Sequence, residues 1–523
     1  MTQSKQLNAF ELKQFVLSIL NNYNSKDDLD EFERNCEVLD LQEDTKLITK
    51  ILLKELVASD VQRACAICSI LLRYNNVSLL IDKFWEILKQ PGLNLQVKVQ
   101  LINFIRDNDS NWTYETCEEQ LGDSTDILDE NTRQMLEHSV SNPELQIDFM
   151  DFLSTLSVND KLALLHSLED DFSNEGLANI LMFLILSDPK SSVSELALKL
   201  LSETKSPLAF YALNQLKNII NDNEILRKIK KHVTELKLQG FNEHKTLEYF
   251  KNLLSDSAPG KFHVTYPDGH GNIALIFTRI TKNNKVRFVS IVANLETGIR
   301  DCFGFYEISR FEADKVFERF FKNEKAIELE PGIFVSVLKY LEINNKFDHY
   351  EYLCWKTLLG DIEIKNTDIA RFVEEKLTES TDLSLVEDVF NSDFCERWYL
   401  DENYNEEFKN RLQDLPSFDN LDFFVERNFE YVFNEYEDDS AKSRLLLGAY
   451  IKLNLNDHNS ANKLYTLLKN KDLRYNLYKQ IFKRSIYEYL TLIKYDSDRN
   501  IYNFTHDNIK KYIDFIEENW CTK

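Results

Sequence analysis

The residues best suited to chemistry gather in one stretch of the chain, between positions 263 and 302. The stretch combines imidazole, carboxylate and thiol groups, which can act as ligands or as acid–base groups: His263, Asp268, His270, Asp301 and Cys302. Asp268 and His270 follow a proline in a turn sequence, and we expect both at an exposed hairpin tip, because loops on a rigid scaffold often carry function. Asp301 belongs to a later strand. Asp268, His270 and Asp301 are the candidate contacts for a ligand or a partner.

The same residues also have a structural interpretation. Asp268-Gly269 is an ordinary turn pair, and His263 would point outward from an edge strand. In an up-and-down sheet the first and fourth strands are not neighbours, so Asp301 meets Asp268 and His270 only if the sheet closes. The sequence leaves both interpretations open, and it indicates no catalytic, cofactor-binding or metal-binding residue.

Other motifs that could carry chemistry favour structural roles. Cys65 and Cys68 have redox spacing, but they lie inside an apolar helical sequence and not at a helix start after a strand, so we expect buried thiols. The basic run at residues 227–231 occupies the outward side of an amphipathic sequence, which favours a solvated face over a site for an acidic partner. No P-loop, dinucleotide fingerprint, HExxH motif or nucleophile elbow occurs, which lowers the expectation of an enzyme.

The net charge restricts the kinds of partner. The 523-residue chain has 62 Lys and Arg residues against 87 Asp and Glu residues, a formal net charge of −25. Such a surface repels phosphate backbones and anionic membranes, so nucleic-acid binding is not expected and a basic or neutral protein partner is favoured. No long apolar run and no signal-peptide pattern occurs, and the scattered cysteines suit reduced thiols. We therefore expect a cytoplasmic protein without a membrane segment.

The candidate residues are positioned by the one part of the chain with strand character, residues 261–309. Apolar residues alternate there, and three turn sequences separate the expected strands: Pro267-Asp268-Gly269, Lys282-Asn283-Asn284-Lys285 and Glu296-Thr297-Gly298. The pattern predicts four strands in up-and-down order. Ser309 and Glu312 form a capping-box pair that opens a helix. Its apolar stripe is expected to cover one face of the sheet: Ala313, Val316, Phe317, Phe320 and Phe321. We place this β module at residues 256–330.

Residues 1–255 have the pattern of successive amphipathic helices. Four of them restart in the same way, with a polar or proline cap before apolar residues at helical spacing: 59–74, 94–107, 142–156 and 188–204. These starts are roughly 35 to 50 residues apart, the range of two-helix repeats. The last combines Asp188-Pro189 with Val193, Ala197, Leu200 and Leu201. It resembles the second helix of a HEAT repeat, and the first half of the chain is similar to HEAT-like, armadillo-like α-solenoids. The resemblance implies a protein that holds partners on an extended surface.

Residues 331–523 return to a helical pattern, with Pro331 at a helix start. A turn-rich stretch at 412–420 separates the first helices of this region from the last ones: 444–455, 461–470, 473–495 and 505–520. These helices could form a second solenoid or a compact bundle. The predicted fold is therefore mainly α, with irregular HEAT-like repeats, an inserted β-meander with its helix, and a C-terminal helical region.

Two functions are compatible with this architecture. The first is a non-catalytic scaffold that binds a protein partner through a concave helical face, because repeat arrays expose extended surfaces. The second is an enzyme, or a ligand or metal sensor, whose pocket lies between the β module and the helical regions and uses Asp268, His270 and Asp301. Alanine at these three positions would spare partner binding in the first case and abolish ligand-induced stabilisation in the second.

Overall fold

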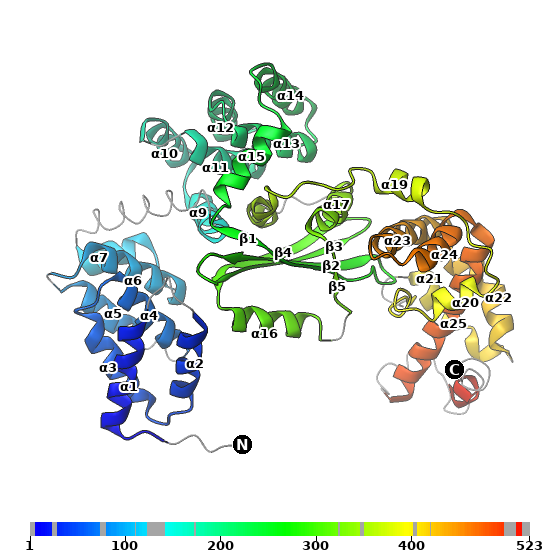
Figure 1. Ribbon diagram of the computed structural model, residues 1–523, viewed down its shortest axis with the longest axis horizontal. Coiled ribbons are helices and arrows are strands. Elements are labelled where there is room, and N and C mark those ends of the chain that lie inside the picture. Colours follow the sequence, from blue (N-terminus) through cyan, green and yellow to red (C-terminus); the bar gives the residue numbers. More distant parts are fainter. Residues whose placement is uncertain are drawn as a thin grey trace. The chain divides into compact units, whose positions relative to one another are not determined.

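The computed structural model is mainly helical and contains one antiparallel β-sheet (Figure 1). It describes residues 6–23, 29–73, 80–90, 92–109, 111–122, 142–171, 174–322, 325–345, 350–400, 405–418, 420–495 and 509–514. Within these residues, no helix combines the length and the apolar character needed to cross a membrane.

The chain divides into two compact units, and both contain part of the sheet. The first unit comprises Met1–Pro259, Thr278–Phe288 and Gly304–Arg319. The second comprises Gly260–Phe277, Val289–Phe303 and Phe320–Lys523. The division therefore crosses the strands, and each unit combines helices with its own portion of the sheet.

The first unit begins with a group of short helices around one apolar core. They are α1 (Ala9–Asn22), α2 (Leu29–Asp40), α3 (Thr45–Leu56), α4 (Val61–Leu72), α5 (Ile81–Leu88), α6 (Leu95–Asn108) and α7 (Tyr114–Leu121). Helices contact their second neighbours as well as their first, as α1 contacts α3 and α4 contacts α6. Asp60 and Asn94 accept hydrogen bonds from the first turns of α4 and α6, which confirms the predicted starts.

A second group of helices follows in the same unit. It consists of α9 (Pro143–Thr155), α10 (Val158–Asp171), α11 (Asn174–Ser187), α12 (Ser192–Glu203), α13 (Pro207–Ile219), α14 (Asn223–Leu238) and α15 (Glu243–Leu253). Here α11 contacts α9 and α13, α13 contacts α15, and α10 contacts α12. The four apolar positions predicted for α12 are buried, but its cap is Ser191 and not Asp188, which lies one turn earlier in the loop.

The sheet contains the four predicted strands in up-and-down order and a fifth strand that the sequence pattern missed. The strands are β1 (Ser257–Val264), β2 (Asn272–Thr281), β3 (Val286–Asn294), β4 (Gly298–Ile308) and β5 (Ile327–Glu328), and their order is β4-β3-β2-β1-β5. In the short antiparallel pairing of β5 with β1, His263 opposes Glu328. The reversals at Asn284 and Gly298 have positive φ angles, 63° and 80°. Because β5 covers the β1 edge, the expectation that His263 points outward from a free edge is wrong.

Two helices pack on the sheet where one was predicted. Ser309 and Glu312 form the expected capping box at α16 (Arg310–Phe320), which runs along the sheet in Figure 1. Of its predicted stripe only Ala313 and Phe321 are buried, while the other three residues are half-buried. The second helix is α17 (Pro331–Glu342), whose packing on the sheet was not predicted. Its Phe334 ring lies 5.2 Å from the ring of Phe262 on β1.

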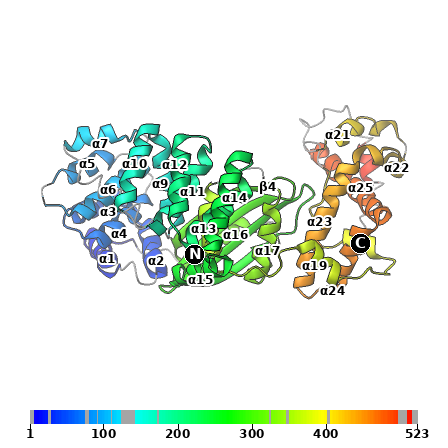
Figure 2. The ribbon, with the colours of Figure 1, turned by 90° about the horizontal axis from the view of Figure 1, so that it is seen from above.

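The remaining helices of the second unit contact partners that are far apart in sequence. They are α18 (Tyr350–Lys356), η2 (Thr357–Leu359), α19 (Ile369–Lys376), α20 (Leu385–Phe390), α21 (Glu406–Leu412), η3 (Leu415–Ser417), α22 (Leu421–Val432), α23 (Glu435–Asn454), α24 (His458–Lys469) and α25 (Lys471–Tyr495). α19 contacts α23 (Figure 2), and α20 contacts both α24 and α25. These contacts are therefore not restricted to consecutive helices. The last predicted helix, 505–520, lies mostly outside the described residues, and its 509–514 portion is helical.

Candidate functional site

The predicted contact residue Asp268 shapes its own loop. Its Oδ1 accepts hydrogen bonds from the backbone N–H groups of His270, at 2.8 Å, and Asn272, at 2.9 Å. Its Oδ2 accepts a third bond, at 3.1 Å, from the side-chain amide of Asn272. A carboxylate that closes a turn on neighbouring backbone groups is a common structural device. Both oxygens of Asp268 therefore already have donors within the loop.

The loop that carries Asp268 and His270 is packed against a distant segment, so the expected exposed hairpin tip is wrong. The Gly269 N–H donates to the carbonyl of Arg397 at 3.0 Å, and the Trp398 indole N–H donates to the carbonyl of Pro267 at 2.9 Å. A Cβ atom on Gly269 would lie 2.7 Å from the backbone nitrogen of Tyr399. Asp268 and His270 are consequently half-buried.

Asp301 lies apart from the other two predicted residues. It is exposed on β4, and its Oδ1 accepts a hydrogen bond from the N–H of Cys302 at 2.9 Å. The strand order places β3 and β2 between β4 and β1. In the described part of the chain, no group of three or more His, Cys, Asp and Glu side chains is arranged to hold a metal ion.

Of the two cysteines with redox spacing, Cys68 lies in the core of the first helical group, whereas Cys65 is half-buried. Cys68 is 4% exposed, and burial raises the pKa of its thiol to about 12. Burial also raises the pKa of Cys65. Because the thiolate is the reactive form, both shifts oppose redox chemistry and suit the structural role expected from sequence.

A groove of about 1200 Å³ lies in the first unit. It runs along α12 and is bounded by α10, α14 and the turns that precede α12 and α14. We call it the α12 groove. Leu196, Lys199 and Glu203 line it at helical spacing on α12, while Lys228 and His232 do so on α14. The groove is therefore lined mainly by α10, α12 and α14, and Ile185 on α11 also contributes to it.

The α12 groove has an apolar floor and a charged rim. Ile185, Leu198 and Ile225 in its lining are less than 9% exposed. On the rim, Lys190 Nζ lies 2.9 Å from Asp222 Oδ2, and this contact lowers the pKa of Asp222 and raises that of Lys190. Apolar floors with polar rims are typical of protein interfaces.

The predicted basic run contributes only in part to this groove. Lys228 lines it, together with the adjacent His232, whose Nδ1 lies 3.0 Å from Glu235 Oε2. Sequence alone treats the run as one solvated face, because it does not show which side of α14 faces a neighbouring helix. The spacing of four residues between Lys228 and His232 was the available signal.

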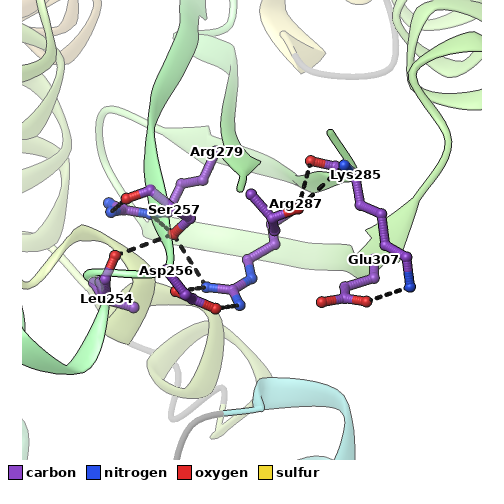
Figure 3. Close-up of polar contacts among 8 residues, drawn as sticks. Leu254, Asp256, Ser257, Arg279, Lys285, Arg287 and Glu307 are labelled. Atoms are coloured by element: carbon purple, nitrogen blue, oxygen red, sulfur yellow. Dashed lines mark hydrogen bonds and ion pairs between the residues drawn. The ribbon is translucent and has the colours of Figure 1, made fainter. Parts of the chain in front are cut away.

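A cluster of buried arginines ties the start of β1 to the sheet within the first unit (Figure 3). Arg287 on β3 is 2% exposed and Arg279 on β2 is fully buried. Arg287 pairs with the carboxylate of Asp256, and Arg279 donates from Nε to the Ser257 hydroxyl at 3.0 Å. The Arg287 guanidinium also lies 4.3 Å from the Tyr306 ring centroid. Sequence analysis missed this cluster, although cations within otherwise apolar strands were a signal for it.

The comparisons with known proteins provide no relative. A scan against protein-family models, a search of curated proteins and a search of solved structures each returned no match.

Proposed function

We propose that this protein is a non-catalytic scaffold that binds a protein partner along the α12 groove. The observation that carries the proposal is the groove itself, a cavity lined mainly by α10, α12 and α14, with an apolar floor and a charged rim. Repeat arrays use such concave surfaces to hold extended partners. Cytoplasmic location belongs to the same proposal and is supported by the scattering of the cysteines through the sequence.

The proposal includes a HEAT-like organisation for residues 1–255. It is supported by contacts between second-neighbour helices, such as α11 with α13 and α13 with α15, which successive stacked pairs require. It is also supported by the buried positions Val193 and Ala197 on α12, which let the helix approach its neighbours closely. In such arrays one helix of each pair lines the concave side. Here α10, α12 and α14 all contribute side chains to the lining of the groove.

The test compares two apolar-to-acidic substitutions in affinity capture from extracts of the native host. Leu196→Glu places a charge on the half-buried groove wall, whereas Leu238→Glu changes a residue that is 85% exposed at the end of α14 and outside the groove. A partner that uses the groove should be recovered at least about tenfold less with Leu196→Glu, because central apolar contacts dominate interface energies. Leu238→Glu should behave like the unaltered chain.

A crosslinking experiment locates the contact directly. A photoreactive side chain at Lys199, in the groove, should form an adduct with the partner, while one at exposed Lys230 on another side of α14 should not. Equal recovery with both leucine variants, together with no adduct at position 199, would refute the proposal.

A further inference from the structure

A second cavity in the first unit has a different chemical character from the α12 groove. It has a volume of about 550 Å³ and lies between the C-terminal end of α6, the loop after it, and one side of α9. We call it the α6–α9 pocket. Its wall combines aromatic rings with charged groups: Arg106, Asp107, Trp112, Asp148, Asp151 and Phe152. The pocket is open to solvent, since its three aspartates are exposed.

The described residues that line the α6–α9 pocket include three aspartates and one cation, Arg106, whose Nε donates to Asp107 Oδ1 at 3.1 Å. Partial desolvation raises the pKa of Asp148, Arg106 lowers it, and Asp107 and Asp151 raise it further. The surroundings thus disfavour the charged form of Asp148, and a cation entering the pocket would relieve that cost.

The aromatic rings make the pocket suited to a planar cation. The Trp112 indole is held in a stack on Trp85, with ring centroids 5.8 Å apart and planes 6° apart. Phe152 stands on the same side of α9 as Asp148 and Asp151. Aromatic faces attract cations, and a guanidinium both stacks on rings and bonds carboxylates at two points, which an ammonium does not.

We propose that the α6–α9 pocket binds an arginine side chain from a basic segment of the partner protein. The pocket combines carboxylates with aromatic walls, and its volume exceeds that of one side chain, so adjacent peptide backbone also fits. The formal net charge of −25 favours the approach of a basic segment. This inference rests on the scaffold function proposed above and specifies the chemistry of one partner contact.

The test uses the purified full-length chain and three labelled peptides in a fluorescence anisotropy titration. One peptide alternates glycine with arginine, the second has lysine at each arginine position, and the third has citrulline, a neutral isostere of arginine. The arginine peptide should bind most tightly, the lysine peptide less tightly and the citrulline peptide at least about tenfold more weakly than the arginine peptide. Equal binding of the arginine and lysine peptides would overturn the inference, since net charge alone would explain it.

Two isosteric variants connect the binding to the pocket. Asp148→Asn and Asp151→Asn each remove one pocket charge and should weaken arginine-peptide binding by about three- to tenfold. Asp82→Asn removes the same charge from an exposed position on α5 outside the pocket and should leave binding unchanged. If all three variants weaken binding equally, or if the unaltered chain binds no peptide, the inference is overturned.

The peptide titration and the affinity capture with Leu196→Glu test separate claims, so either claim can be overturned while the other is retained. Loss of partner capture with Leu196→Glu, combined with no pocket-dependent peptide binding, would retain the scaffold function and overturn the inference. Pocket-dependent peptide binding with no effect of Leu196→Glu would support the inference and refute the groove as the partner site.

Discussion

The guanidinium of Arg287 meets the carboxylate of Asp256 at two points, with Nη1 3.2 Å from Oδ1 and Nη2 2.5 Å from Oδ2. The two sides of this pair differ in exposure, because the Arg287 side chain is 2% exposed and that of Asp256 is 54% exposed. Arg287 lies on β3, and Asp256 lies between α15 and β1. The pair therefore joins the end of the helical group to the sheet strands in the same unit.

Asp256→Asn should lower the free energy of unfolding, because it leaves the buried Arg287 charge without its carboxylate. We expect a loss of about 1–3 kcal/mol, toward the lower end because solvent screens the exposed carboxylate. Urea denaturation followed by circular dichroism measures the change. Glu318→Gln, at an exposed position on α16, should stay within about 0.5 kcal/mol. A similar result for both variants would show that the pair does not stabilise the unit.

Alanine substitutions distinguish a structural Asp268 from a ligand-binding one. Asp268→Ala removes the three hydrogen bonds that the Asp268 carboxylate accepts in the loop. It should lower the free energy of unfolding by about 1–3 kcal/mol even when no ligand is present. Asp301→Ala, at an exposed position, should change stability by less than about 0.5 kcal/mol. Thermal unfolding of both variants makes the comparison. An unchanged melting temperature for Asp268→Ala would argue against the structural role and favour the ligand-site alternative.

Gly269→Ala should destabilise the second unit, because the added Cβ would meet both the backbone nitrogen and the backbone oxygen of Tyr399 at 2.7 Å. Backbone atoms cannot move aside as a side-chain end can, so we expect a cost of about 1–3 kcal/mol. The Trp398 indole, which is bonded to Pro267 in the same loop, should report the displacement through its fluorescence. Unaltered stability and emission would mean that the loop is not held against this segment.

The stability of the first unit should depend on pH through Glu144, which accepts a hydrogen bond from the Tyr306 N–H at 2.8 Å. Burial raises the pKa of Glu144 despite that bond. A raised folded-state pKa means that the folded chain binds this proton more tightly than the unfolded chain does. The stability gained from the proton is fully present below the unfolded-state pKa, and it is lost as the pH rises through the folded-state pKa. The stability of Glu144→Gln relative to the unaltered chain should therefore increase as the pH rises from the usual range of glutamate pKa values to neutral. The melting temperatures of both chains, measured across that pH range, check this. A difference between them that stayed constant would contradict the prediction.

Local sequence patterns were sufficient for the four longer strands and for several helix starts, although they missed β5. Caps such as Asp60 and Asn94, the Ser309–Glu312 box and the alternation in β1 and β2 depend on residues a few positions apart, and the structure has these elements where the patterns place them. In its described residues, the turn-rich stretch predicted at 412–420 contains the short η3 between α21 and α22. In these cases one turn or one strand contains all the groups that interact.

The candidate site was less accessible to sequence reasoning. Asp268 and His270 had the composition of a functional loop, but the segment around Trp398 covers that loop from more than a hundred residues away. The α12 groove was missed because its lining comes from several helices, and the role of Lys228 depends on which side of α14 faces them.

The sequence by itself determined the helices, the four-strand meander, their caps and turns, and the acidic surface, because each depends on local spacing or on composition. Only the tertiary structure decided that β5 covers His263, that Arg287 pairs with Asp256, and that α6 and α9 share a pocket. The physical reason is that these contacts join side chains distant in the chain. Their formation depends on packing and on the pairing of buried charge, which no local pattern encodes.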